Sequence, residues 1–224
     1  MKLTNEQITA IEKTLVLNGL IYEDIKLELT DHIASEIEAE MEENEISFET
    51  AFKQAFQNWK EQLRPSSSFW LGRKNIAPKI IIEKWELIHR KWNPAMIQFA
   101  IFITIIIGIL KVLSTENIPE NISMVMRWFY MALWVLIATI RIIIWKSKHK
   151  TLFGFIFKKR SRVPLNFLVL IALGLFPSRI LEINSVLGIA VVFIVVLVTL
   201  FSFSCLTLAY KHFQFERKLS ISKL

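Results

Sequence analysis

Two kinds of hydrophobic pattern divide the chain. In residues 1–64 the apolar side chains recur every three or four positions, whereas from residue 95 onward they form long runs. A repeat near 3.6 residues is typical of amphipathic helices, and apolar runs of about 20 residues are typical of helices that cross a membrane. We therefore predict an all-α protein, with a small N-terminal three-helix domain (1–64) and a four-helix transmembrane region (95–211).

Local signals set the predicted ends of the three N-terminal helices. Thr4 and Gln7 have the spacing of a capping box, and the first helix is expected to stop at Asn18-Gly19. Ser47 is the expected cap of the third helix, which ends near residue 63. The second helix, from about 22 to 43, carries one apolar stripe, formed by Ile25, Leu29, Ile33, Ile37 and Met41.

The membrane half begins after a predicted linker. Residues 65–94 combine prolines and serines with a basic, Trp-bearing stretch at 80–92, so we expect a linker and an interfacial amphipathic segment there. Four spans are predicted at about 95–114, 124–145, 164–183 and 185–210, followed by a tail at 212–224. Pro177 and Arg179 interrupt the third run, for which a tilted or re-entrant element is the alternative.

Charge changes sign between the two halves. Residues 1–64 hold 6 Lys and Arg against 14 Asp and Glu, a net charge of −8, and residues 65–224 hold 21 against 6, a net charge of +15. All charged residues in the loop between the second and third runs are basic, and loops rich in Lys and Arg stay on the cytoplasmic side. The residues expected to orient the protein in this way are Lys146, Lys148, Lys150, Lys158, Lys159, Arg160 and Arg162. We predict cytoplasmic N- and C-termini and four spans, which keep both ends on one side.

Basic residues beside apolar runs favour membrane lipid as a partner over nucleic acid, for which we expect no direct binding. The N-terminus has no apolar stretch after a basic start, so we expect no cleaved signal peptide. A possible electrostatic contact joins the acidic domain to the basic loop 146–162, and salt would weaken it.

Candidate chemistry on the acidic domain centres on the second helix. His32 stands four residues from both Glu28 and Glu36, so the three side chains share one helical face beside Asp31. With one histidine and no cysteine nearby, a solvated or partner-binding face is favoured over a metal site, which usually needs four ligands. We therefore predict partner binding by these four residues and no metal.

The membrane half offers little catalytic chemistry. Its single cysteine, Cys205, has no companion histidine, and the sequence contains no phosphate-binding glycine loop and no HExxH or GxSxG motif. We expect no catalytic residue and no cofactor. Arg127 and Arg141 lie in the second apolar run near its ends, where reaching the headgroups is favoured over a binding or gating role.

One family resemblance covers about residues 4–63. Gly19-Leu20, the segment ELTDHIASEIEAEME from Glu28 to Glu42, and Ser47-Phe48-Glu49 resemble the HTH-associated alpha-helical signalling domain. The resemblance implies a sensing or docking module joined to membrane spans in a bacterial inner membrane, often beside transcription regulators. It implies that Asp31 and His32 determine a helix–helix or partner contact, and it implies no catalytic residue.

The leading hypothesis is a non-enzymatic integral membrane signalling or regulatory protein with a cytoplasmic docking module. The alternative is a small transporter or channel subunit, which would need more polar groups inside the membrane than the sequence supplies. A membrane enzyme is a weaker third hypothesis, because the polar residues are scattered. The sequence leaves the ligand, the partner and the oligomeric state open.

Overall fold

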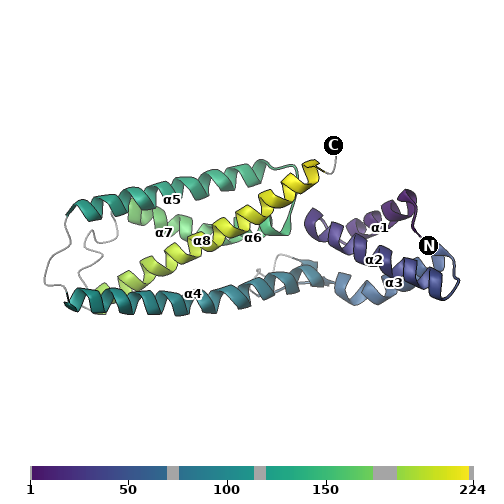
Figure 1. Ribbon diagram of the computed structural model, residues 1–224, viewed down its shortest axis with the longest axis horizontal. Coiled ribbons are helices and arrows are strands. Elements are labelled where there is room, and N and C mark those ends of the chain that lie inside the picture. Colours follow the sequence, from purple (N-terminus) through teal and green to yellow (C-terminus); the bar gives the residue numbers. More distant parts are fainter. Residues whose placement is uncertain (1, 70–75, 114–119, 174–185, 222–224) are drawn as a thin grey trace. The chain divides into compact units, whose positions relative to one another are not determined.

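The computed structural model describes residues 2–69, 76–113, 120–173 and 186–221, and these residues are predominantly helical (Figure 1). The helices are α1 (Asn5–Leu17), α2 (Glu23–Glu43), α3 (Phe48–Leu63), α4 (Lys79–Leu113), α5 (Glu120–Lys146), α6 (Leu152–Arg160), α7 (Arg162–Ala172) and α8 (Val186–Ile221). Two short antiparallel strands, β1 (Pro65–Ser66) and β2 (Ala77–Pro78), pair with each other. The prediction of an all-α protein is confirmed.

The chain divides into two units. Unit 1 contains residues up to His89 together with His149–Leu152, and unit 2 contains Arg90–Lys148 and the chain from Phe153 onward. Unit 1 therefore extends past residue 64, and it includes three residues from the loop between α5 and α6 together with Leu152, the first residue of α6. Residues 80–92, expected as a separate interfacial segment, form the first part of α4, and Pro94 lies inside the same helix.

The core of unit 1 lies between α1, α2 and α3, which pack in sequence order (Figure 1). Four of the five residues of the predicted stripe on α2 are buried, with Leu29, Ile33 and Ile37 at 2% exposure or less, and the fifth, Met41, is half-buried. The side chains of Thr4 and Gln7 cap the start of α1 reciprocally, and Ser47 caps α3. These predicted caps are confirmed, as is the turn at Gly19, whose φ of 85° favours glycine.

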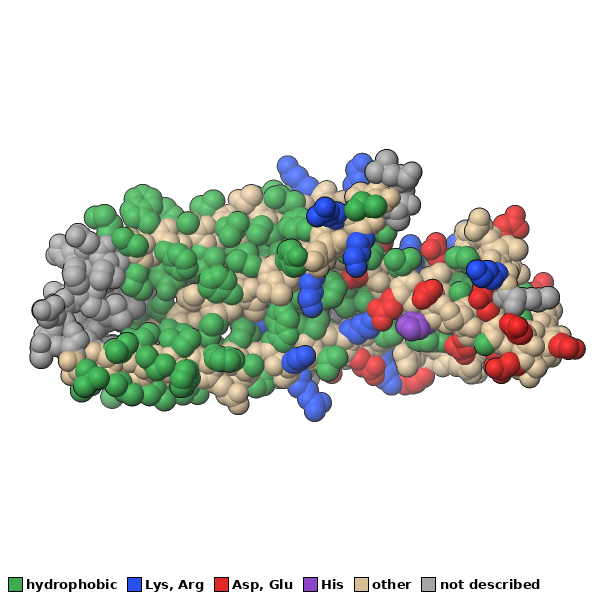
Figure 2. All heavy atoms as spheres, in the orientation of Figure 1, with side chains coloured by type: hydrophobic (Ala, Val, Ile, Leu, Met, Phe, Trp, Pro, Cys, Tyr) green, Lys and Arg blue, Asp and Glu red, His purple; other side chains and the backbone are tan. Residues whose placement is uncertain are grey.

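Unit 2 contains three long apolar helices, α4, α5 and α8, and the shorter helices α6 and α7. The closest packing is between α5 and α7, and α8 packs against both, whereas α4 makes only sparse contacts with other helices in the described parts of the chain. Hydrophobic side chains cover most of the visible face of unit 2, and Lys and Arg side chains gather at one end of it (Figure 2). In water such a surface would aggregate, and in a bilayer it faces lipid.

Three helices of the described chain are long and apolar enough to cross a membrane, within Lys79–Leu110, Met124–Lys146 and Gly188–Ile221. The prediction of four such helices is not confirmed, because the described residues contain three. The predicted span at 164–183 falls on α7, whose 11 residues cover roughly 16 Å at ~1.5 Å per residue, about half of a ~30 Å hydrocarbon core. The remainder of that predicted span, from residue 174, lies outside the described residues.

Candidate functional site

The start of α2 needs partners for its backbone, because the first amides of any helix lack an acceptor within the helix. Tyr22 occupies the cap position and makes no capping hydrogen bond through its side chain. The acceptor comes instead from the loop between α5 and α6. The amide of Glu23 donates to the carbonyl oxygen of Lys150 over 2.8 Å, so residues 149–152, which we call the strap, cap α2 from far along the sequence.

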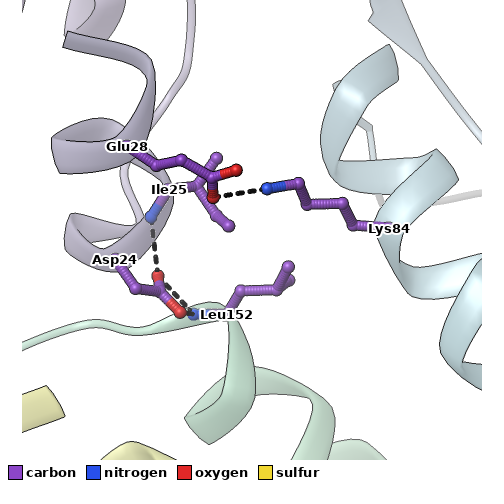
Figure 3. Close-up of polar contacts among 5 residues, drawn as sticks. All are labelled: Asp24, Ile25, Glu28, Lys84 and Leu152. Carbon is purple, nitrogen blue, oxygen red and sulfur yellow. Dashed lines mark hydrogen bonds and ion pairs between the residues drawn. The ribbon is translucent and has the colours of Figure 1, made fainter. Parts of the chain in front are cut away.

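The side chain of Asp24 forms a second contact between α2 and the strap. Both of its carboxylate oxygens accept from the backbone amide of Leu152, over 2.9 and 3.0 Å, and one of them also accepts from the amide of Ile25 (Figure 3). Leu152 is 2% exposed, so this amide is shielded from water. A carboxylate at the first turn is further favoured by the helix dipole. Asp24 therefore stabilises both the N-terminal turn of α2 and the position of the strap.

A histidine completes the attachment of the strap. His149 Nδ1 lies 2.5 Å from a carboxylate oxygen of Glu23, and both side chains are about one-third exposed. Glu23 thus contacts the strap through its backbone amide and through its side chain. Two consecutive acidic residues on α2 bind three of the four strap residues.

The four predicted partner-binding residues divide into two pairs in the structure. Glu28 forms an ion pair with Lys84 at the start of α4, at 2.5 Å (Figure 3), and Glu36 accepts hydrogen bonds from Asn58 and Trp59 of α3, each at 2.8 Å. Glu28 and Glu36 therefore bind other helices of unit 1. Asp31 and His32 are exposed on α2, and they remain the part of the predicted face that is open to a partner.

The described ranges contain no group of three or more His, Cys, Asp or Glu side chains placed to hold a metal ion. Glu28 and Glu36 are engaged elsewhere, so the spacing of four residues around His32 does not produce a cluster of ligands.

The basic residues predicted to orient the protein differ in exposure. Lys146, Lys148, Lys150 and Arg162 are exposed, and Lys158 and Lys159 are half-buried. Arg160 is 3% exposed, which was not expected for a loop cation. It donates from Nη2 to the side-chain oxygen of Asn93 over 3.0 Å, and its guanidinium lies 4.4 Å from the ring centroid of Phe201. Burial lowers the pKa of Arg160, and Cys205 nearby opposes this shift.

The two arginines of the second apolar run also differ. Arg127 is exposed on α5, which agrees with a side chain that reaches for headgroups. Arg141 is half-buried, and its Nη1 donates to the carbonyl oxygen of Lys158 and to Ser161 Oγ, at 2.5 and 2.7 Å. Arg141 therefore fixes the corner between α6 and α7.

No protein-family model, curated protein or solved structure matches this chain. The resemblance of residues 4–63 to the HTH-associated alpha-helical signalling domain thus stays a prediction. The site has to be interpreted from its own contacts.

Several residues of the site were missed at the level of sequence. Glu23 and Asp24 precede the predicted face on α2, and His149 and Leu152 are more than 120 residues away from them. One available signal was the lack of a Ser, Thr, Asp or Asn at the cap position of α2, since an uncapped helix start requires an acceptor from elsewhere. The opposite charges of the acidic domain and the loop 146–162 were the other signal.

Tyr22 gives the start of α2 a dependence on alkaline pH. Burial, together with the charge of Asp24, raises the pKa of Tyr22 to about 12. The folded state therefore keeps the phenol proton at pH values where the unfolded chain, with a pKa near 10, releases it. We expect the stability of unit 1 to be unaffected by this group below about pH 10 and to fall between about pH 10 and 12.

Hydrogen exchange and tyrosine absorbance of the full chain in detergent, followed from pH 8 to 12, measure this dependence. Tyr22→Phe has no proton to lose and is expected to flatten the loss of stability in that range. An identical alkaline profile in the variant would assign the loss to other groups.

Proposed function

We propose that the protein is a non-enzymatic integral membrane signalling or regulatory protein, in which the acidic helical domain docks a cytoplasmic protein and the strap links that domain to the membrane helices. The observation that carries the proposal is a pair of contacts at the start of α2: the carbonyl oxygen of Lys150 accepts from the amide of Glu23, and the amide of Leu152 donates to the carboxylate of Asp24. The chain enters unit 1 directly after α5 and leaves it directly into α6. A shift of α5 or α6 therefore acts on the start of α2, and α2 carries Asp31 and His32.

We further propose that the chain crosses the membrane four times. At one end of unit 2, Asn93 of α4 binds Arg160, and Lys211 of α8 lies over the rings of Trp92 and Phe153. Near the other end, Gly108 of α4 and Ile189 of α8 line one pocket. The chain must return from the first end to the second between residues 161 and 186, and α7 is the described part of that return.

Four crossings put both termini on one side of the membrane, and the basic loop assigns that side to the cytoplasm. The resemblance of residues 4–63 to the signalling domain favours a bacterial inner membrane and a transcription regulator as the docked protein. Asp31 and His32 supply the exposed contact, since Glu28 and Glu36 are bound within unit 1.

Photocrosslinking in cells tests the docking function. A photoreactive residue in place of His32 is expected to capture one specific cytoplasmic protein, and Asp31→Lys is expected to reduce the capture at least tenfold by reversing the charge of the contact. Glu43→Lys is the matched control, because Glu43 is an exposed acid at the other end of α2.

The link to the membrane helices has its own readout. Asp24→Ala, which frees the strap, is expected to change the capture several-fold while Asp31 and His32 remain in place. Equal capture by Asp31→Lys and Glu43→Lys would contradict a specific docking surface. Capture of the same abundant proteins by a second photoreactive residue, placed at Glu43, would also contradict it.

A further inference from the structure

Arg160 is a buried cation with incomplete hydrogen bonding. Its Nη2 donates to Asn93, but Nε and Nη1 have no hydrogen-bond partner among the described residues, although both are buried. A guanidinium carries five N–H donors and stays protonated in proteins. Leaving charged donors buried and unpaired is costly, and the cost is removed when an acceptor with a negative charge binds them.

Within the described ranges, the surroundings of Arg160 supply further cations but no free carboxylate. Arg141 and Lys158 lie at the same corner between α6 and α7. Glu216 of α8 is engaged with Ser147 and His212. The charge that would balance Arg160 is thus not supplied by the described part of the protein, which favours an anion from outside it.

A small apolar pocket lies between the same two helices that flank Arg160. It has a volume of about 170 Å³ and is lined by Thr104, Ile105 and Gly108 of α4 and by Ile189 and Val192 of α8. The hydroxyl of Thr104 is bound to the carbonyl oxygen of Ala100, so the lining offers almost only apolar contacts. At Gly108 an added Cβ would meet no atom within 4 Å.

The spacing between the guanidinium and the pocket fits a lipid. Asn93 and Thr104 are 11 residues apart on α4, or roughly 16 Å at ~1.5 Å per residue. One leaflet of a ~30 Å hydrocarbon core is about 15 Å thick. An acyl chain that begins beside Asn93 therefore reaches the pocket, and its path follows α4, which packs only sparsely against the other described helices of unit 2.

We propose that Arg160 binds the phosphate of an anionic phospholipid whose acyl chain occupies the pocket between α4 and α8. Nε and Nη1 are closed to solvent in this structure, so the long side chain of Arg160 turns from Phe201 toward the phosphate on binding. Arginine suits this ligand because its planar guanidinium pairs with two phosphate oxygens at once. Basic sites between membrane helices on the cytoplasmic side bind anionic headgroups in this manner.

Native mass spectrometry of the full chain in mild detergent tests the site, with phosphatidylglycerol, phosphatidylcholine or inorganic phosphate added. We expect phosphatidylglycerol to bind at least tenfold more tightly than phosphatidylcholine. Arg160→Gln is expected to weaken phosphatidylglycerol binding by about tenfold to a hundredfold, because it removes charge-assisted hydrogen bonds. Arg162→Gln, which removes an exposed charge two residues away, is the matched control and is expected to change binding less than threefold.

Gly108→Leu tests the acyl chain separately and does not depend on the folding of an Arg160 variant. An added Cβ at position 108 meets no atom within 4 Å, and leucine there is expected to weaken phosphatidylglycerol binding by roughly threefold to tenfold by excluding one or two methylene groups from the pocket. Equal losses in Arg160→Gln and Arg162→Gln would overturn the proposal, since binding would then follow net charge alone. Unchanged binding in Gly108→Leu, or displacement of the lipid by inorganic phosphate at equal concentration, would also overturn it.

Discussion

Replacing Asp24 with alanine is expected to release the strap from α2 and to accelerate hydrogen exchange at the Leu152 amide by about 10- to 100-fold. Leu152 is only 2% exposed, and in the wild-type protein its amide donates to both carboxylate oxygens of Asp24. The variant removes both of these acceptors. An unsatisfied buried donor costs about 1–3 kcal/mol, which is a factor of about 5 to 150, and the expected acceleration lies within that range. The exchange of peptides spanning residues 149–152 in the full-length protein, read by mass spectrometry, is the measurement.

Asp31→Ala is the control for this variant. Asp31 is an exposed carboxylate on the same helix, and its side chain accepts no hydrogen bond within the described ranges, so the exchange of Leu152 is expected to stay at the wild-type rate. If Asp24→Ala also leaves that rate unchanged, other contacts hold the strap, and the coupling proposed for Asp24 is wrong.

Replacing Ile33 with alanine is expected to destabilise unit 1 by about 2–5 kcal/mol, the usual range for truncating a buried isoleucine. Ile33 is 0% exposed and lies in the centre of the stripe that α2 presents to α1 and α3. The truncation removes apolar contacts and leaves a cavity. Amide exchange of α1, α2 and α3 in the full chain measures the loss, and α8 provides an internal reference.

Two further variants test whether the loss of stability follows the amount of buried apolar surface that is removed. Ile33→Val removes one methylene and is expected to cost about 0.5–1.5 kcal/mol. Leu27→Ala changes a side chain that is 52% exposed and is expected to cost little. Similar losses in Leu27→Ala and Ile33→Ala would contradict the burial pattern of α2.

Local patterns predicted unit 1 well, because its helices depend on residues close in sequence. The capping box at Thr4 and the cap at Ser47 involve residues three positions apart, and the stripe on α2 follows from helical periodicity. The predicted end of the domain at residue 64 differs from the end of unit 1 at His89. Ile81 and Trp85, which looked like interfacial residues, are 1% and 3% exposed within unit 1.

Long-range pairing could not be predicted from the same patterns. The composition of residues 146–162 indicated a cytoplasmic loop, but nothing local distinguished Arg160, which is buried, from Arg162, which is exposed. The contact of Asp24 with Leu152 joins a carboxylate to a backbone amide, and every residue except proline carries such an amide. Side-chain chemistry therefore gives no indication of which loop residue it binds.

The distant cap of α2 has a consequence for the synthesis of the protein. Asp24 and Leu152 are 128 positions apart, so a ribosome adding about 5–20 residues per second makes the strap roughly 6–25 s after it makes the start of α2. During this interval α1, α2 and α3 can pack, but the first turn of α2 lacks its acceptor and its partner amide. The acidic domain is thus completed only after α4 and α5 have been made, which ties its final folding step to the arrival of the membrane helices.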